Sequence, residues 1–319
     1  MRFIFRADAS REIGTGHVMR SSVLAEEAIS RGYECIFVGE ISDMDWVANR
    51  IANMGFSQVV AESGSFDSDA NSDVLILDSY SISTSDAFIS KNKWKLVMSI
   101  CDEITPKYDV DIELHPSLES TSTKRVASIV LSGPEYILIR RGIEKSKRSA
   151  ALGAVTKVLV FGGGSDPFGF VREISYVLSS MGLNLEVHIF SDEVIPANLS
   201  LGLIQHPLGS ALDSVVCHVD VVLTTASTSS LECIAREIPT GVVCAVDNQK
   251  GCFEQLARLG YASKIGVRRS SGVWDFDLNS IHELLGSQKK RDSLKKATRG
   301  LIDFKGASRV IDILAAKCL

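Results

Sequence analysis

Two segments of this chain combine a short apolar run, a glycine-containing loop and the start of a helix-periodic sequence, and they lie about half the chain apart. The first runs from Phe3–Phe5 through a polar loop at 6–16 into apolar residues at helical spacing from Val18 onward. The second runs from Thr156–Phe161 into Gly162–Pro167. Such segments are typical of strand–loop–helix units. The repetition therefore predicts two α/β domains, each of which begins with one such unit.

Six further short apolar runs extend the pattern. They are separated by stretches of loop or helical composition, as in an open, mostly parallel sheet with helices on both faces. In the first half they are Glu34–Val38, Val74–Leu77 and Leu96–Ile100, and in the second half Leu185–Phe190, Val219–Leu223 and Thr240–Ala245. We expect two Rossmann-like α/β domains with a cleft between them, because such sheets bind ligands at the carboxyl ends of their strands.

The boundary between the domains is expected near residue 150. The segment Glu144–Ala154 is charged and rich in small residues, as linkers between domains are. We assign 1–150 to an N-terminal domain and 151–319 to a C-terminal domain. The last segment, Lys289–Leu319, predicts terminal helices, and one alternative is that the final helix returns to the N-terminal domain.

The composition argues against several classes of protein. Because 34 Lys and Arg stand against 39 Asp and Glu, for a net charge of −5, we expect no dominant nucleic-acid surface. Charges at Arg2, Arg6 and Asp8 interrupt the apolar N-terminus, and no uncharged apolar run approaches the length of a membrane span. We therefore expect a cytoplasmic protein. The seven cysteines are scattered and form no CxxC pair, which argues against a zinc site or a disulfide framework.

The first loop, RADASREIGTGHVMR at 6–20, follows a strand and precedes a helix, where active-site loops commonly lie. Its glycines permit close approach of a ligand, and the N–H groups at the helix start favour an anion. His17 is either a cap or packing residue at the helix start or a general base, since imidazole exchanges a proton near neutral pH. The candidate substrate contacts in this loop are Arg6, Asp8, Ser10, Gly14 and Gly16, beside His17.

The second loop has three consecutive glycines after Thr156–Phe161, which suits a phosphate-bearing ligand. It is no Walker A loop, because no Gly-Lys-Ser/Thr follows, and it does not match the dinucleotide pattern GxGxxG. The alternative is a tight turn ended by Asp166-Pro167. The candidate contacts are Gly163, Gly164, Ser165 and Asp166.

A third segment, TTASTSSLE at 224–232, places small hydroxyl residues before a helix. The side chains of Ser227, Thr228, Ser229 and Ser230 either cap that helix or donate to a diphosphate. In the second case the helix dipole adds about 0.3–1 kcal/mol for each well-placed negative charge. Glu232 is either a capping-box carboxylate or an acceptor for the hydroxyls of a ribose. One strand later, Asn248 and Gln249 follow the carboxyl end of Thr240–Ala245.

Together, RADASREIGTGHVMR, FGGGSDP, STSSLECIAREIP and DNQ resemble the nucleotide-sugar hydrolases of pseudaminic acid biosynthesis. These enzymes remove UDP from UDP-2,4-diacetamido-2,4,6-trideoxy-β-L-altropyranose, and they are similar to the MurG-like glycosyltransferases of the GT-B fold. The stretches LILDSY, ICDE, GPEYILIRR and FKGASRV extend the resemblance over most of the chain. It implies a GT-B architecture, a small-molecule UDP-sugar substrate, inverting hydrolysis at C1, and neither a metal nor another cofactor.

The resemblance also implies roles for individual residues. His17 falls on the catalytic histidine that activates water, and Tyr80 falls on a tyrosine that faces the sugar. Glu232 matches the residue that holds the uridine ribose, and Ser227–Ser230 matches the diphosphate-binding turn. The pair Asn248-Gln249 matches an Asn-Gln pair near the sugar.

This sequence departs from the family pattern at three places, and these departures affect the expected sugar-binding side more than the UDP site. Ser79 stands where the family has the His of Asp-His-Tyr, and His115-Pro116 replaces a usual Asn. The segment Arg140–Ile143 replaces an Arg-x-Glu-Phe ending. The fold and the UDP site therefore follow the family more closely than the sugar side does.

Two other functions stay open on the sequence. A MurG-like glycosyltransferase would use the same residues, with His17 deprotonating an acceptor hydroxyl. Transferases with lipid acceptors usually present an apolar and basic patch. The helix candidate at 42–55 instead mixes Met44, Trp46 and Met54 with the acids Asp43 and Asp45, which favours a water-soluble substrate. The other function is a non-catalytic nucleotide-sugar binding protein, which measured turnover would exclude.

Overall fold

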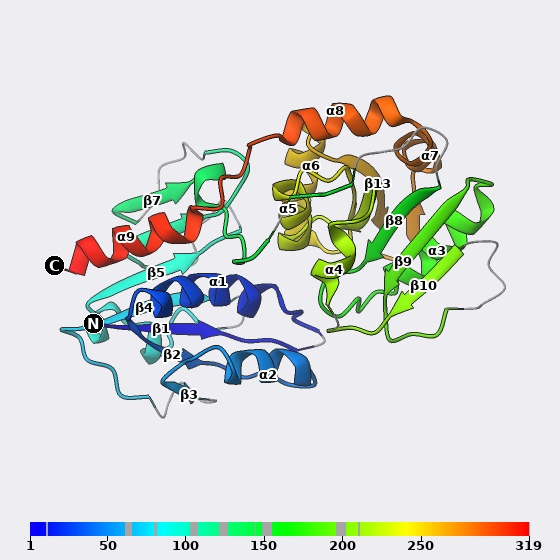
Figure 1. Ribbon diagram of the computed structural model, residues 1–319. Coiled ribbons are helices and arrows are strands. Elements are labelled where there is room, and N and C mark those ends of the chain that lie inside the picture. The colour runs from blue at the N-terminus through cyan, green and yellow to red at the C-terminus, as the bar shows by residue number, and fades with distance from the viewer. Residues whose placement is uncertain are drawn as a thin grey trace. The chain divides into compact units, whose positions relative to one another are not determined.

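The computed structural model describes residues 1–10, 12–60, 66–79, 82–102, 108–120, 127–143, 145–148, 155–195, 202–209 and 211–318 (Figure 1). The chain divides into two units. Unit 1 comprises Met1–Arg141 and Asp303–Leu319, and unit 2 comprises Gly142–Ile302. The division thus lies between Arg141 and Gly142, whereas the sequence places it near residue 150, and the end of the chain belongs to unit 1.

Unit 1 is built on a parallel sheet. Its strands are β1 (Arg2–Ala7), β2 (Glu34–Val38), β3 (Gln58–Val60), β4 (Asp73–Asp78), β5 (Leu96–Ile100), β6 (Ile112–His115) and β7 (Ile129–Ser132). Among the described residues these seven strands follow the order β3-β2-β1-β4-β5-β6-β7, and every neighbouring pair is parallel. The expected strands β1, β2, β4 and β5 are confirmed. The sequence missed β3 and β7, whose apolar runs are very short, and β6, in which Glu113 interrupts the apolar pattern.

Unit 2 repeats this arrangement. Its strands are β8 (Thr156–Phe161), β9 (Leu185–Phe190), β10 (Gly202–His206), β11 (Val221–Thr225), β12 (Thr240–Cys244), β13 (Ser263–Arg268) and β14 (Trp274–Phe276). In the part of unit 2 that the structure describes, the seven strands follow the order β10-β9-β8-β11-β12-β13-β14. All pairs are parallel except β13 with β14. The expected strands β8, β9, β11 and β12 are confirmed, with β11 beginning two residues later than expected.

Helices pack on both faces of the sheet in unit 2, whereas among the described residues of unit 1 the α-helices pack on one face, although the sequence predicts helices on both. In unit 1 they are α1 (Gly16–Ser30), α2 (Asp45–Ala52) and α9 (Gly306–Cys318), with short 3-10 turns η2 (Ala87–Ile89), η3 (Lys91–Lys93) and η4 (Pro134–Tyr136). In unit 2 they are α3 (Phe170–Ser180), α4 (Leu212–Val216), α5 (Thr228–Ala235), α6 (Lys250–Arg258), α7 (Leu278–Gly286) and α8 (Gln288–Thr298), with the 3-10 turn η5 (Asp247–Gln249). Within the described ranges, none of the helices combines the length and the apolarity that a membrane crossing requires.

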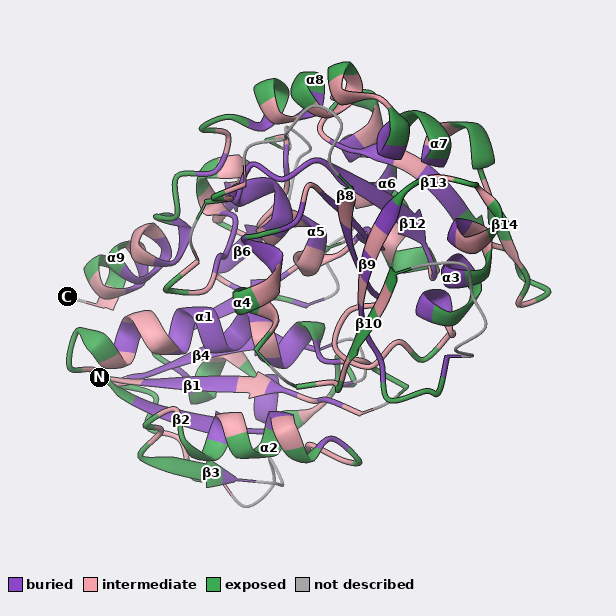
Figure 2. Cartoon of the chain, turned by 45° about the vertical axis from the view of Figure 1, so that its right-hand side comes forward, coloured by how far each residue is buried: buried purple, intermediate pink, exposed green. Residues whose placement is uncertain are grey.

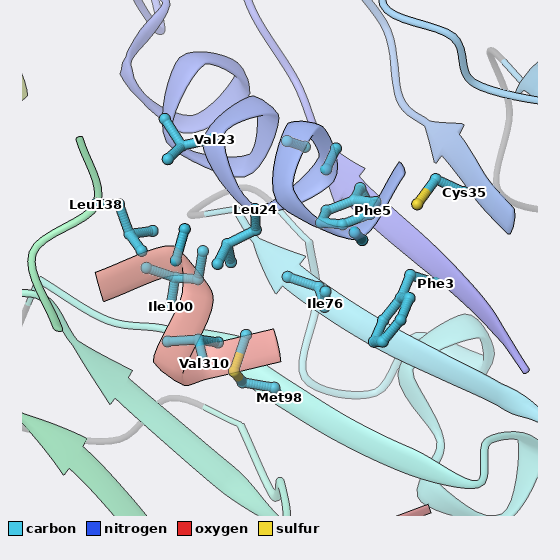
Figure 3. Close-up of a cluster of buried hydrophobic side chains, with 14 of the residues drawn as sticks. Phe3, Phe5, Val23, Leu24, Cys35, Ile76, Met98, Ile100, Leu138 and Val310 are labelled. Atoms are coloured by element: carbon cyan, nitrogen blue, oxygen red, sulfur yellow. The ribbon is translucent and has the colours of Figure 1, made fainter. Parts of the chain in front are cut away.

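The core of unit 1 explains why the strands are apolar on both faces. Phe3 of β1, Met98 of β5 and Leu24 of α1 lie in one buried cluster, to which Val310 of α9 also belongs (Figure 3). A second cluster, around Leu75, covers the opposite face of the same sheet. Figure 2 shows the result, in which the central strands are buried and the helices keep one side exposed. The last helix is therefore an integral part of the core of unit 1.

The strand order also fixes where a ligand is expected in each unit. In both sheets the chain reverses its direction of strand addition between the first and fourth strands, at β1/β4 and at β8/β11. In open α/β sheets, ligands commonly bind outside the carboxyl ends of the strands at such a reversal point. The loop before His17 follows β1, and the triple-glycine loop follows β8. Two of the loops singled out in the sequence thus lie at these two reversal points.

We expect Gly306→Ala to destabilise unit 1 by about 1–3 kcal/mol, the usual cost of overpacking. Gly306 begins α9, and a Cβ there would lie 2.2 Å from the carbonyl oxygen of Ile137, so α9 would have to move away from the core. Thermal unfolding followed by circular dichroism measures the effect. Gly251→Ala in α6 is the matched control, because its Cβ meets nothing within 4 Å, and equal melting temperatures for the two variants would contradict the prediction.

Candidate active site

The loop between β1 and α1 is closed by its own backbone. The Gly14 N–H donates to the Ser10 carbonyl oxygen at 2.8 Å, and the Ile13 N–H donates to Ser10 Oγ at 3.1 Å. Gly14 has a φ of +80°, which glycine adopts without strain. This closure starts α1 at Gly16 and places His17, the second residue of the helix, in a buried position.

A carboxylate holds one nitrogen of the His17 ring. His17 Nδ1 lies 2.6 Å from Oδ1 of Asp78, the last residue of β4, which pairs with Ala7 of β1 across the sheet. Because a carboxylate accepts, this contact assigns the proton of the neutral ring to Nδ1 and leaves the lone pair on Nε2. The arrangement matches a histidine that accepts a proton at Nε2 while Asp78 stabilises the charge that forms.

The structure adds two residues that the sequence reasoning missed, Arg20 and Asp102. Arg20 lies one helical turn after His17 and donates to both oxygens of Asp78, from Nε to Oδ2 at 2.9 Å and from Nη2 to Oδ1 at 2.7 Å. Its Nη1 donates to Asp102, the second residue after β5. A signal for this set exists in the sequence: Asp78 and Asp102 each follow an apolar strand, and Arg20 follows His17 at helical spacing.

Electrostatics keeps Asp78 ionised. Burial opposes its ionisation, but the neighbouring Arg20 and His17 outweigh burial and lower the pKa of Asp78 to about 2. For Arg20, burial acts against the charge, while Asp102 and Asp78 raise its pKa well above the ordinary value. The histidine therefore faces an anion whose own charge is partly balanced by a buried cation.

The other candidates of the first loop are held near the end of β1. Arg6 Nη1 donates to Asp8 Oδ1 at 2.5 Å, and the same oxygen accepts the Glu40 N–H at 3.0 Å. Both side chains are half-buried. Tyr80 lies outside the described residues. Its neighbour Ser79 is buried, and its carbonyl oxygen accepts from the Tyr108 hydroxyl at 3.0 Å.

In unit 2, three of the loops predicted from the sequence lie along one edge of the sheet. They follow β8, β11 and β12, which are neighbouring parallel strands, so their carboxyl ends point to the same edge. Gly163, in the first of these loops, has a φ of +90°, and a Cβ there would be 4.0 Å from the Thr225 hydroxyl at the end of β11. The triple-glycine loop and the hydroxyl-rich segment are thus direct neighbours.

The hydroxyl side chains at the start of α5 have different positions. Ser227 contacts Thr225, with 3.1 Å between the two hydroxyl oxygens, and no side-chain hydrogen bond among the described residues caps the helix. Ser227, Thr228 and Ser229 are half-buried, and they stay candidates for a diphosphate. Ser230 is fully buried, and its hydroxyl donates to the Ser227 carbonyl at 2.7 Å, so its role is to shape the turn.

Glu232 is too far along α5 for a capping box. The helix begins at Thr228, which makes Ser230 the third helical residue and Glu232 the fifth, whereas the capping-box carboxylate occupies the third. The helix geometry therefore excludes the capping box, and the contact to a ribose stays a prediction. Glu232 is half-buried in the second turn of the helix.

The remaining candidates of unit 2 divide into loop-shaping and accessible groups. The Asp166 carboxylate accepts the N–H groups of Phe170 at 3.0 Å and Val171 at 2.9 Å, and burial raises its pKa to about 6 against these two bonds. Asp166 thus caps α3. Gln249 Oε1 accepts the Ala245 N–H at 2.9 Å, while Asn248 is exposed. Gly164 and Ser165 are half-buried in the glycine loop.

Within the described residues, no group of three or more His, Cys, Asp or Glu side chains is arranged to hold a metal ion.

No model of a protein family matches the chain. The chain is similar to the UDP-2,4-diacetamido-2,4,6-trideoxy-β-L-altropyranose hydrolase of Campylobacter jejuni subsp. jejuni, at 27% identity over 145 residues, which are 44% of this chain and 52% of that protein. The match thus spans about half the length of this curated relative.

Solved structures of glycosyltransferases resemble the whole chain. MurG of Acinetobacter baumannii aligns with a TM-score of 0.64 at 10% identity, over 99% of this chain and 100% of that one. The Streptomyces sp. SF2575 glycosyltransferase SsfS6, complexed with thymidine diphosphate, aligns with a TM-score of 0.59 at 11% identity, over 99% of each chain. At such identities the likeness concerns the fold, and it shows that this chain has the GT-B architecture of two Rossmann-like units.

Proposed function

We propose that this protein hydrolyses a UDP-activated 2,4-diacetamido-2,4,6-trideoxy sugar, as part of the biosynthesis of a nonulosonic acid such as pseudaminic acid. The observation that carries the proposal is the contact between His17 and Asp78 at the β1/β4 reversal point. A buried histidine whose Nδ1 is held by a carboxylate is the arrangement that a water-activating base requires. The partial similarity to a hydrolase of such a sugar supports the substrate class.

The UDP moiety is assigned to unit 2. The backbone of Gly163, Gly164 and Ser165 and the hydroxyls of Ser227–Ser229 would hold the diphosphate, since the uncapped start of α5 offers N–H groups to an anion. Glu232 would accept the ribose hydroxyls, and Asn248 would approach the sugar. The groups assigned to the diphosphate are uncharged. In this proposal, diphosphate binding therefore depends on backbone N–H groups and hydroxyls.

In the reaction, water attacks C1 of the sugar on the face opposite UDP. His17 Nε2 takes a proton from the water as the new C1–O bond forms, and the bond between C1 and the UDP oxygen breaks with its electron pair remaining on UDP. The configuration at C1 is inverted. A positioned base supplies about 10² to 10⁴ in rate, or roughly 3–5 kcal/mol of the barrier. The backbone N–H groups near the diphosphate stabilise the charge that grows on the leaving group.

A panel of UDP-sugars tests the proposal directly. We expect UDP release from a diacetamido-trideoxy sugar without any acceptor, an unchanged rate in EDTA, and an inverted anomer in the first NMR spectra of the product. UDP release that requires an added acceptor alcohol would instead identify a glycosyltransferase, such as the structural neighbour SsfS6. Absence of turnover with tight UDP binding would identify a nucleotide-sugar binding protein.

We expect Glu232→Ala to weaken UDP binding by about 1–3 kcal/mol, because two ribose hydroxyls lose a charged acceptor. Isothermal titration calorimetry with UDP measures this loss. Glu283→Ala is the matched control, since Glu283 is an exposed glutamate of α7 in the same unit. Equal UDP affinity in the two variants would leave Glu232 as a residue of the helix surface only.

A further inference from the structure

His17 and Asp78 belong to a larger set of side chains. Arg20 binds both oxygens of Asp78 and, through its third nitrogen, Asp102. His17, Asp78, Arg20 and Asp102, here called the four-residue network, come from α1, the end of β4 and the residue pair after β5. All four belong to unit 1. A base needs only its carboxylate partner, so the additional ion pairs require their own explanation.

The geometry points to Arg20 and Asp102 as positioning residues that set the orientation and the effective charge of Asp78 toward His17. This inference rests on the proposed function, because it concerns the residue assigned as the base. Arg20 is a buried side chain that contacts two carboxylates, and it lies next to the reacting ring without being assigned a contact to the substrate.

Orientation follows from the two hydrogen bonds to Asp78. Arg20 Nε and Nη2 bind different oxygens of the carboxylate, which fixes its plane in the way that a guanidinium fork does. The oxygen that contacts His17 at 2.6 Å is the same Oδ1 that accepts Arg20 Nη2 at 2.7 Å. A change in the Arg20 fork would therefore turn the carboxylate away from Nδ1.

Charge balance follows from the composition of the network. While the His17 ring is neutral, two carboxylates and one guanidinium leave the network with one net negative charge, and uptake of the water proton brings the network to neutrality. Arg20 alone would cancel the charge of Asp78, and Asp102 restores it. Cys101, beside Asp102, does not contribute charge, because burial raises its pKa to about 11.

The two positioning residues therefore act on the ring in opposite directions. Loss of the Arg20 charge removes a positive charge that contacts Asp78, which favours the protonated ring. Loss of the Asp102 charge leaves Arg20 to oppose proton uptake. A merely structural ion pair predicts no such opposition, since the loss of either partner would disturb the same packing.

The test is the dependence of kcat on pH for the wild type, Arg20→Gln and Asp102→Asn. We expect the acidic limb of the profile to move to higher pH in Arg20→Gln and to lower pH in Asp102→Asn, each by about one pH unit. Arg50→Gln is the matched control, because Arg50 forms an ion pair with Glu26 at 2.7 Å in the same unit, and its limb should not move. UDP affinity should be unchanged in all three variants.

A second measurement makes the test independent of turnover. The ring signal of His17, identified in NMR spectra by its loss in His17→Asn, should show proton uptake at higher pH in Arg20→Gln and at lower pH in Asp102→Asn. If the wild type turns over no UDP-sugar, the proposed function fails, and this titration still decides the inference. Shifts that are absent, or that have the same sign in both variants, would overturn it.

Folding of the variants is the remaining requirement. If Arg20→Gln does not fold, Asp102→Asn decides the question alone, since the Asp102 side chain is 32% exposed and tolerates substitution more readily. Arg20→Lys provides a further comparison, because it keeps the charge and loses the fork. Its acidic limb should stay at the wild-type pH while kcat falls, whereas a limb that moves with Arg20→Gln would contradict the assigned charge effect.

Discussion

His17→Asn is expected to lower kcat by at least about a hundredfold on the UDP-sugar that the wild type hydrolyses, with UDP affinity nearly unchanged. Asparagine cannot accept the water proton with useful basicity, so the contribution of the base, about 10² to 10⁴, is lost. UDP contacts in the proposal come from unit 2 and do not involve His17. A loss in kcat without a loss in ligand binding is the pattern of an interaction made only in the transition state.

Steady-state kinetics and calorimetry with UDP measure the two halves of this prediction. His282→Asn is the control, because His282 is exposed on α7 and belongs to none of the candidate sites. A His17→Asn variant with near-normal kcat would remove His17 from the mechanism. The search for the base would then turn to Asp8, which lies in the first loop, or to Asp78, which contacts His17.

Asp78→Asn should lower kcat by a comparable factor, about 10² to 10⁴, for a different reason. The carboxylate that accepts the Nδ1 proton, at 2.6 Å, becomes an amide that can present its NH₂ group to the ring. The lone pair is then moved to Nδ1 in part of the molecules, and the charge that stabilises the protonated ring is lost in all of them. The ring stays in place, but Nε2 becomes a poor base.

The same kinetic measurements check this second prediction, with a thermal melt to establish folding. Asp86→Asn is a suitable control, since Asp86 lies in unit 1 and its carboxylate accepts the Phe88 N–H at the start of the 3-10 turn η2. If Asp78→Asn folds and retains kcat within a factor of three of the wild type, the His17–Asp78 contact has no role in catalysis.

Much of the fold could be predicted from the sequence because apolar runs report buried strands directly. The runs at Phe3–Phe5 and Val158–Phe161 are uninterrupted, and each precedes a loop that contains glycines, so the strand and its loop are both visible. β6 was missed because Glu113 and His115 interrupt its pattern. The two side chains contact each other at 3.1 Å and are buried together, a pairing that a linear pattern cannot report.

For the candidate site, the sequence predicts which loops carry it. His17 and the loops of unit 2 were found because they follow strands, and the parallel sheets then place the loops of unit 2 on one edge. The specific use of each side chain was not predictable. The sequence predicts UDP contacts for Asp166 and Ser230, but it does not report that the Asp166 carboxylate accepts N–H groups at the start of α3 or that the Ser230 hydroxyl donates to the Ser227 carbonyl oxygen.

By itself, then, the sequence determined the two α/β units, their central strands and the loops that leave them, because hydrophobic periodicity and glycine placement are local properties. The tertiary structure decided that the last helix, α9, completes the core of unit 1, and that Asp78 and Asp102 meet His17 and Arg20. The contacts of Arg20 with Asp78 and Asp102 join residues that are 58 and 82 positions apart. They depend on the order and register of the strands, which the local pattern of each strand does not specify.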